Sequence, residues 1–136
     1  MKVLAFVCFT VVLFCVALAP ASALGAREWR PDAATVARVE AYMNTHMPTR
    51  EGSATLTIPL RLQDYARYYA GVFDGGGRRM VRGVYIRFEP ERYPRGTHIV
   101  PENALPMILD GGCGVIEVRF DVAAGRALWA ACNGLA

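Results

Sequence analysis

Residues 65–88, YARYYAGVFDGGGRRMVRGVYIRF, place two apolar stretches on either side of a glycine-rich connector. Residues 56–73 fit helical spacing, but the content of Tyr, Val and Phe over residues 65–73 favours a strand. The connector supplies glycines that adopt positive φ and reverse the chain directly into a second strand over residues 78–88. The sequence therefore predicts a β-hairpin here, in which Gly83 marks a bulge.

A second hairpin is predicted over residues 113–132. In a register whose paired residue numbers add up to 245, Cys113 faces Cys132 and Ile116 faces Trp129. One face of this hairpin is then apolar and includes Trp129, while the other face is mixed and includes Arg119. This pattern is typical of an antiparallel sheet that is covered on one side.

A helix is predicted over residues 31–47, before the two hairpins. Its apolar residues recur at intervals of three and four positions: Val36, Val39, Met43 and Met47. Proline and aspartate open the first turn, and Pro48 ends the helix. Residues 24–30 are expected to form a loosely ordered leader.

These elements predict one α+β domain over residues 24–136, with the N-terminal helix packed on an antiparallel sheet of about four strands. A short strand at residues 97–100 completes that sheet. The outline is similar to that of cystatin-like folds, which is a likeness of fold and carries no function with it.

Cys113 and Cys132 are predicted to form one disulfide, because an even number of cysteines in an oxidising compartment pairs by default. The bond closes a loop of 20 residues, counting both ends. Two alternatives are a metal site with His46 and His98, and Cys113 as a nucleophile with His98 as its base. The spacing lacks the short Cys-x-x-Cys pattern of a zinc knuckle, and no third residue orients the Cys and His pair. We therefore expect no metal and no cofactor.

The N-terminus has the pattern of an export signal. Lys2 supplies a positive start, residues 3–18 form an apolar run, and Ala21-Ser22-Ala23 provides the small residues of a cleavage site. We expect cleavage of residues 1–23 after Ala23, a periplasmic or secreted location, and no stable membrane insertion of the remaining chain.

Loss of residues 1–23 removes the only lysine, Lys2, and leaves 14 arginines against 12 acidic residues. The arginines are spread along the chain and interleaved with Asp and Glu. A nucleic-acid-binding domain usually carries a clustered basic face instead. The charge pattern therefore argues against nucleic acid as a partner.

Candidate partner-binding residues lie in the first predicted hairpin. They are Tyr65, Arg67, Tyr68, Arg78 and Arg79. The first three bring aromatic and guanidinium groups together, a composition enriched at protein interfaces. The last two follow three glycines, which gives residues 75–79 a second interpretation as an anion cradle built from backbone N–H groups. Tyr69, within the same cluster, is expected in the core.

Four landmarks resemble those of uncharacterised small exported bacterial proteins. They are Tyr65-x-Arg67-Tyr68-Tyr69-Ala70, Arg82-Gly83-Val84-Tyr85, Asp110-Gly111-Gly112-Cys113 and Cys132-Asn133-Gly134. The resemblance covers roughly residues 65–136, and it implies an envelope or secreted location. It supplies no active site, so no catalytic residue is assigned.

The sequence predicts a noncatalytic exported module that binds another envelope protein, for example as an inhibitor or an immunity-like partner. A small-ligand-binding envelope protein, with the tyrosine and arginine cluster lining its pocket, is the first alternative. A small enzyme that uses Cys113 and His98 is the second. The sequence leaves the identity of the partner and the oligomeric state open.

Overall fold

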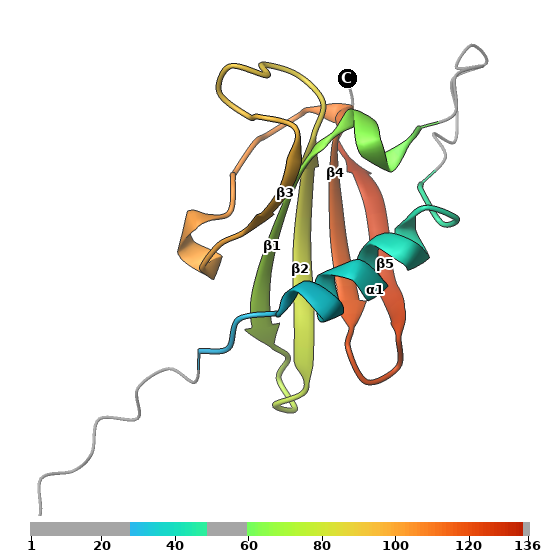
Figure 1. Cartoon of the computed structure of the whole chain (residues 1–136), viewed down its shortest axis with the longest axis vertical. Helices are drawn as coiled ribbons and strands as arrows, with labels where there is room; N and C mark the ends of the chain where they lie inside the picture. Colours follow the sequence, from blue (N-terminus) through green and yellow to red (C-terminus); the bar gives the residue numbers. More distant parts are fainter. Residues whose placement is uncertain (1–27, 49–59, 135–136) are drawn as a thin grey trace, which may run out of the picture.

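Five strands form one mixed sheet in the computed structural model, which describes residues 28–48 and 60–134 (Figure 1). In chain order the elements are α1 (Ala33–Met43), η1 (Leu62–Asp64), β1 (Ala66–Phe73), β2 (Arg79–Ile86), β3 (Gly96–Ile99), η2 (Glu102–Ala104), β4 (Gly112–Asp121) and β5 (Arg126–Asn133). The strand order across the sheet is β3-β1-β2-β4-β5. The fold is therefore α+β, as predicted. The predicted signal, residues 1–23, and residues 24–27 of the leader lie outside the described residues.

The hairpin predicted over residues 65–88 is present. β1 and β2 pair antiparallel from Ala66 opposite Ile86 to Phe73 opposite Arg79. Of the connector glycines, Gly77 takes a positive φ of 77°. The competing helical interpretation of residues 65–73 is wrong, because a glycine turn that reverses the chain sets the two stretches side by side as paired strands.

The bulge expected at Gly83 does not form. Gly83 pairs regularly with Tyr69 on one side and with Val118 on the other. A Cβ atom at this position would lie 3.2 Å from Tyr85 Cε1 and 3.3 Å from Val118 Cβ. Glycine is used here because neighbouring side chains approach the backbone closely, which is a different reason from the one predicted.

The expectation of about four antiparallel strands is wrong in one respect. The short strand β3 adds a fifth strand, and it pairs parallel to β1, with Ala66 opposite Gly96 and Tyr69 opposite Ile99. Since β2 already has β1 and β4 as neighbours, residues 87–95 must carry the chain past β1 to reach a free edge. The chain reverses after β2, and β2 is antiparallel to β1, so a strand at that edge runs parallel to β1.

Helix α1 is shorter than the predicted range of 31–47. Asp32 caps its N-terminus, where Oδ1 accepts a hydrogen bond of 2.7 Å from the backbone N–H of Thr35. The helix ends at Met43, four residues before Met47. Pro48 disfavours helical backbone at the residue before it, so the chain leaves the helix through turns before reaching Met47.

The final hairpin has a different register from the predicted one. Gly112 lies opposite Asn133, which fits the sum of 245, but Ile116 then lies opposite Cys132. Residues 113–115 have no partner on β5, and a second irregularity separates Arg119 from Phe120. These irregularities place Trp129 opposite Arg119 instead of Ile116, and therefore on the other face of the sheet.

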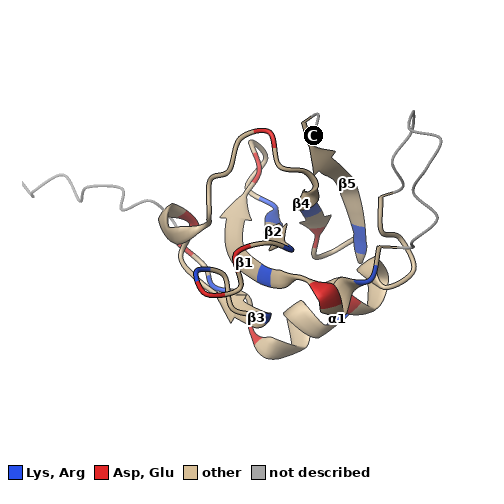
Figure 2. Ribbon diagram, turned by 90° about the horizontal axis from the view of Figure 1, so that it is seen from above, with Lys and Arg blue, Asp and Glu red and all other residues tan. Residues whose placement is uncertain are grey.

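The sheet is covered on both faces, although unequally. On one face α1 lies across the sheet (Figures 1 and 2), and its buried residues pack onto the sheet. That first core contains Val36, Val39, Met43, Leu62, Tyr65, Tyr69, Val81, Tyr85, Ile116, Val118 and Phe120. On the opposite face a second core of Val84, Ile86 and Val115 is covered by residues such as Phe88, Tyr93 and Ile108. The one-sided sheet that we predicted is therefore wrong, because the connections on either side of β3 fold back over one end of the second face.

Trp29 belongs to the packed structure, although it lies in the expected leader. Its indole Nε1–H donates a hydrogen bond of 2.9 Å to the carbonyl oxygen of Val72. The ring covers Gly71, where a Cβ atom would lie 2.3 Å from the Trp29 carbonyl oxygen and 2.7 Å from its Cε2. Gly71 is therefore required for this approach.

We predict that Gly71→Ala lowers the free energy of unfolding by about 2 kcal/mol, because the added methyl group displaces Trp29. Urea denaturation monitored by tryptophan fluorescence measures the change. Gly75→Ala is the matched control, since no heavy atom lies within 4 Å of the position its Cβ would take. Equal loss of stability in the two variants would contradict the packing role of Gly71.

The predicted disulfide between Cys113 and Cys132 is present, with the two Cα atoms 4.4 Å apart. It joins β4 to β5. On the chain-entropy model, a bond that closes a loop of this length contributes about 3 kcal/mol.

Replacing both residues, Cys113→Ser with Cys132→Ser, is expected to lower the free energy of unfolding by about 3 kcal/mol. Urea denaturation of the oxidised protein, the reduced protein and the double variant measures this change. Reduction and substitution should have similar effects, and a reduced protein as stable as the oxidised one would refute the prediction.

Candidate functional site

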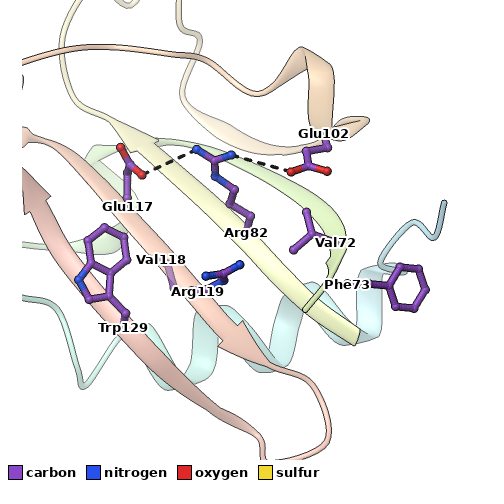
Figure 3. Close-up of a pocket in the computed structure, with 8 residues that line it drawn as sticks. All are labelled: Val72, Phe73, Arg82, Glu102, Glu117, Val118, Arg119 and Trp129. Atoms are coloured by element: carbon purple, nitrogen blue, oxygen red, sulfur yellow. Dashed lines mark ion pairs between the residues drawn. The ribbon is translucent and has the colours of Figure 1, made fainter. Parts of the chain in front are cut away.

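The second face of the sheet is open beyond its covered end, and we call this region the open face. It forms a concave space of about 480 Å³. Side chains from four strands and from η2 line it: Val72, Arg82, Glu102, Glu117, Arg119 and Trp129. In Figure 3, α1 lies behind the sheet as seen from this side, and Phe73 points away from the other labelled residues. The helix therefore covers one face and leaves the other accessible.

Arg82 lies between two carboxylates on the open face (Figure 3). Its Nη1 is 4.0 Å from Glu102 Oε1, and its Nη2 is 3.9 Å from Glu117 Oε2. Glu117 is held in turn by Asn133, whose Nδ2 donates a hydrogen bond of 3.0 Å to Glu117 Oε1. Ion pairs this exposed contribute little to stability. Their effect is to orient Arg82 and to balance its charge.

Arg119 and Trp129 form a second group on the open face. They are cross-strand partners on β4 and β5. The side chain of Trp129 is about half exposed, at 50%. Arg119 is exposed, and no ion pair or hydrogen bond joins its guanidinium group to another described residue. Tryptophan and arginine are the side chains most enriched at the energetic centres of protein interfaces.

The sequence did not single out Arg119 and Trp129 as site residues. The predicted register placed Trp129 on the apolar face, opposite Ile116. The signal that could have exposed this error is the run of glycines around Cys113, since Gly111, Gly112 and Gly114 favour an irregular strand end.

Tyr65 and Tyr69 lie in the first core and offer no surface to a partner, because both are fully buried. The hydroxyl of Tyr65 donates a hydrogen bond of 2.8 Å to the Cys113 carbonyl oxygen. The hydroxyl of Tyr69 lies 3.2 Å from Glu40 Oε1 and 3.3 Å from the Tyr85 hydroxyl. The expected core position of Tyr69 is confirmed, and Tyr65 packs in the same core.

The guanidinium group of Arg67 is held by hydrogen bonds within the protein. Its Nε donates a hydrogen bond of 2.9 Å to Glu40 Oε1, and its Nη2 donates one of 3.0 Å to Thr97 Oγ1. Its Nη1 contacts the carbonyl oxygens of Leu62 and Tyr65 at 3.3 and 3.1 Å. With all three nitrogens engaged, Arg67 joins β1 to α1 and β3.

Tyr68 points to the opposite face from Arg67 and packs under the covering connection. Its ring stacks on His98, with centroids 4.7 Å apart, and contacts the edge of Tyr93. His98 is fixed by a 2.7 Å hydrogen bond between its Nε2 and the Pro94 carbonyl oxygen. Tyr68 and Arg67 therefore do not form a common surface.

Arg78 and Arg79 are exposed at the tip of the first hairpin, but the anion cradle predicted there is occupied by the chain itself. Asp74 Oδ1 accepts hydrogen bonds from the backbone N–H groups of Gly76 and Arg78, at 2.9 and 2.8 Å. The same hydrogen bonds and the Arg78 guanidinium lower the pKa of Asp74. Arg79 lies over the ring of Trp29, 5.6 Å from its centroid. The five candidate residues are thus dispersed over the molecule.

The alternative enzyme site of Cys113 and His98 requires a free thiol at Cys113, and Cys113 has none. Cys113 Sγ is bonded to Cys132, so it provides no thiolate nucleophile for His98. His46 lies elsewhere, stacked on Tyr42 with centroids 3.9 Å apart. Within residues 28–48 and 60–134, no three His, Cys, Asp or Glu side chains are grouped so as to hold a metal ion.

Comparison with known proteins adds no relative: no family model, curated protein or solved structure matches the chain. No helix in the described part of the chain is long and apolar enough to span a membrane.

Alkaline pH should unfold the protein, because burial raises the pKa of both Tyr69 and Tyr85 well above the usual value near 10. The unfolded state then loses these protons above about pH 10 while the folded state keeps them, so stability is complete below that pH and falls above it. Each tyrosine contributes a slope of about 1.4 kcal/mol per pH unit. Urea denaturation between pH 8.5 and 11 measures the slope.

Tyr69→Phe provides the control for this titration, since it removes one of the phenols whose pKa is raised and should make the slope smaller. Lys2 is the only lysine in the chain, so tyrosines are the main side chains that titrate in this range. A stability that stays constant up to pH 11 would show that both phenols ionise freely in the folded protein.

Proposed function

We propose that this chain is an exported, noncatalytic protein-binding module that contacts its partner through the open face of the sheet. The observation that carries the proposal is the exposed pair of Trp129 and Arg119, which lies beside a concave surface. A tryptophan at such a position buries a large area when a partner covers it, at a small cost in side-chain entropy.

The shape of the open face supports a protein partner. Arg82, on the central strand β2, is already balanced by Glu102 and Glu117, so it provides a polar contact that needs no new counter-charge. Trp129, on the edge strand β5, provides an apolar anchor on the same face. Interfaces usually combine apolar anchors with polar contacts of this kind.

The N-terminal signal pattern and the disulfide support an oxidising location, either the periplasm or the medium. The resemblance of the Tyr65 and Cys113 landmarks to small exported bacterial proteins points the same way. We therefore propose an envelope or secreted protein as the partner, with an inhibitor or immunity-like role for this chain. The cystatin-like outline, in which a helix crosses a sheet, remains a proposal about the fold.

A small ligand is the second candidate for the open face. A concave volume of about 480 Å³ lies within the range of ligand sites. Arg119 would pair with an acidic group of such a ligand, and Trp129 would contact its apolar part.

Site-specific photocrosslinking in the native host tests the proposed function. With p-benzoylphenylalanine in place of Trp129, we expect one discrete adduct whose second component is a single exported protein. The same group in place of Ala37, which is exposed on α1 on the opposite side of the sheet, is the matched control. Identical products at both positions, or none at position 129, would contradict a protein-binding role for the open face.

A further inference from the structure

Strand β5 forms one edge of the sheet, and no other described strand pairs with its outer side. It is the last strand in the order and has eight residues, RALWAACN, of which only Arg126 is charged. It contains no lysine or proline, which are residues that commonly prevent further pairing at an edge. No backbone hydrogen bond from another described residue reaches its outer side. Within residues 28–48 and 60–134, its outward backbone groups therefore have no backbone partner.

The opposite edge of the sheet is shorter and is partly covered. β3 has four residues, and the guanidinium group of Arg30 donates a hydrogen bond to the carbonyl oxygen of Ile99. A short strand with a side chain on its outer carbonyl is a poor template for pairing. If the sheet extends, it extends from β5.

The charges beside β5 are unbalanced. Asp121 faces Arg126 in the register, but Asp121 is buried and already engaged. Its Oδ2 is 3.5 Å from Arg78 Nη1, and its Oδ1 accepts hydrogen bonds of 2.9 Å from the N–H groups at positions 123 and 124. The two glutamates of the open face are near Arg82. Arg119 and Arg126 thus have no carboxylate partner among the described residues.

We infer that β5 pairs with an extended acidic segment of a partner protein, which adds a sixth strand to the sheet. This inference rests on the proposed function and names the chemistry of the partner. Strand addition supplies affinity through backbone hydrogen bonds, and alternate side chains supply specificity.

The two faces of the sheet determine which side chains the added segment carries. Every second side chain lies on the open face, beside Trp129, where carboxylates meet Arg119 and Arg126. The other side chains lie on the α1 side, beside Ala127 and Ala130, which pack against the first core. The segment that fits therefore alternates acidic residues with apolar residues that favour strands.

A second copy of the chain fits the edge less well. Pairing β5 with itself antiparallel about a two-fold axis normal to the sheet keeps the two open faces on the same side. Arg119 and Arg126 of the second copy would then join those of the first on one surface, without added carboxylates. Like charges across an interface oppose association, whereas an acidic segment removes the imbalance.

Synthetic eight-residue peptides test the inference on the oxidised protein. In the first peptide Glu alternates with Val between terminal threonines, and in the control Lys replaces each Glu. We expect the Glu peptide to bind about ten-fold more tightly than the Lys peptide in isothermal titration, with the difference decreasing at high salt. Binding should also protect alternate backbone amides of β5 from hydrogen exchange.

N-methylation of the Glu peptide separates strand addition from simple charge attraction. Methyl groups on one alternate set of backbone amides block one edge of the peptide and leave its side chains unchanged. We expect one methylated set to abolish binding and the other to leave it intact. Equal binding of both methylated peptides would overturn strand addition.

Charge-removing variants test the role of the arginines. Arg119→Gln with Arg126→Gln should weaken binding of the Glu peptide about ten-fold. Arg95→Gln is the matched control, because Arg95 is exposed in the connection between β2 and β3 and should change binding less than two-fold. An equal effect of the control and of the double variant would overturn the assignment of the two arginines.

Three further results distinguish this inference from the proposed function and from self-association. Self-association in light scattering, with protected β5 amides in the absence of peptide, would assign the edge to a second copy and overturn the acidic partner. Crosslinking at position 129 to a partner that leaves the β5 amides unprotected would overturn strand addition and leave the proposed function standing. Absence of crosslinking at position 129 overturns the proposed function, whatever the peptides do.

Discussion

The carboxylate of Glu40 is the contact on which the placement of the helix depends. Its Oε1 accepts hydrogen bonds from Arg67 Nε at 2.9 Å, Thr97 Oγ1 at 2.8 Å and the Tyr69 hydroxyl at 3.2 Å. One atom of α1 is thereby joined to β1 and to β3. A charged group that is largely removed from water is stable only when it is paired and hydrogen-bonded in this way. Because these partners occupy fixed places on the sheet, they also fix which face α1 covers.

The placement of α1 explains why the two faces of the sheet differ. The α1 side carries the large buried tyrosines, including Tyr69 and Tyr85, whose hydroxyls are satisfied within the core. The opposite side has a smaller core at one end, and beyond it the strands carry Arg82, Arg119 and Trp129 into solvent. A sheet that buries both faces completely would have no surface left for recognition. Here the helix covers one face with the larger core, and part of the other face stays exposed.

Local patterns in the sequence predicted elements that neighbouring residues determine. The glycine connector predicted the first hairpin, and the cysteine pair predicted the disulfide. Contacts between distant residues could not be predicted in the same way. The parallel position of β3 depends on which edge was free, and the packing of Trp29 depends on Gly71, 42 positions later. Likewise, the tyrosine cluster had the composition of an interface, but the packing of α1 on the sheet buried Tyr65 and Tyr69.

The misplacement of Trp129 follows from a shift of register next to the disulfide. The pairing sum changes from 245 at Gly112 to 248 at Ile116, and an odd shift turns the side chains of residues 129–132 to the other face. That shift occurs in the segment where Cys113 is bonded to Cys132. The bond holds the end of β5 against the irregular end of β4, but it is compatible with both registers, because Cys113 also faces Cys132 where the pairing sum is 245. The register in which Trp129 lies on the open face therefore depends on the unpaired residues 113–115 of β4, which the bond alone does not determine.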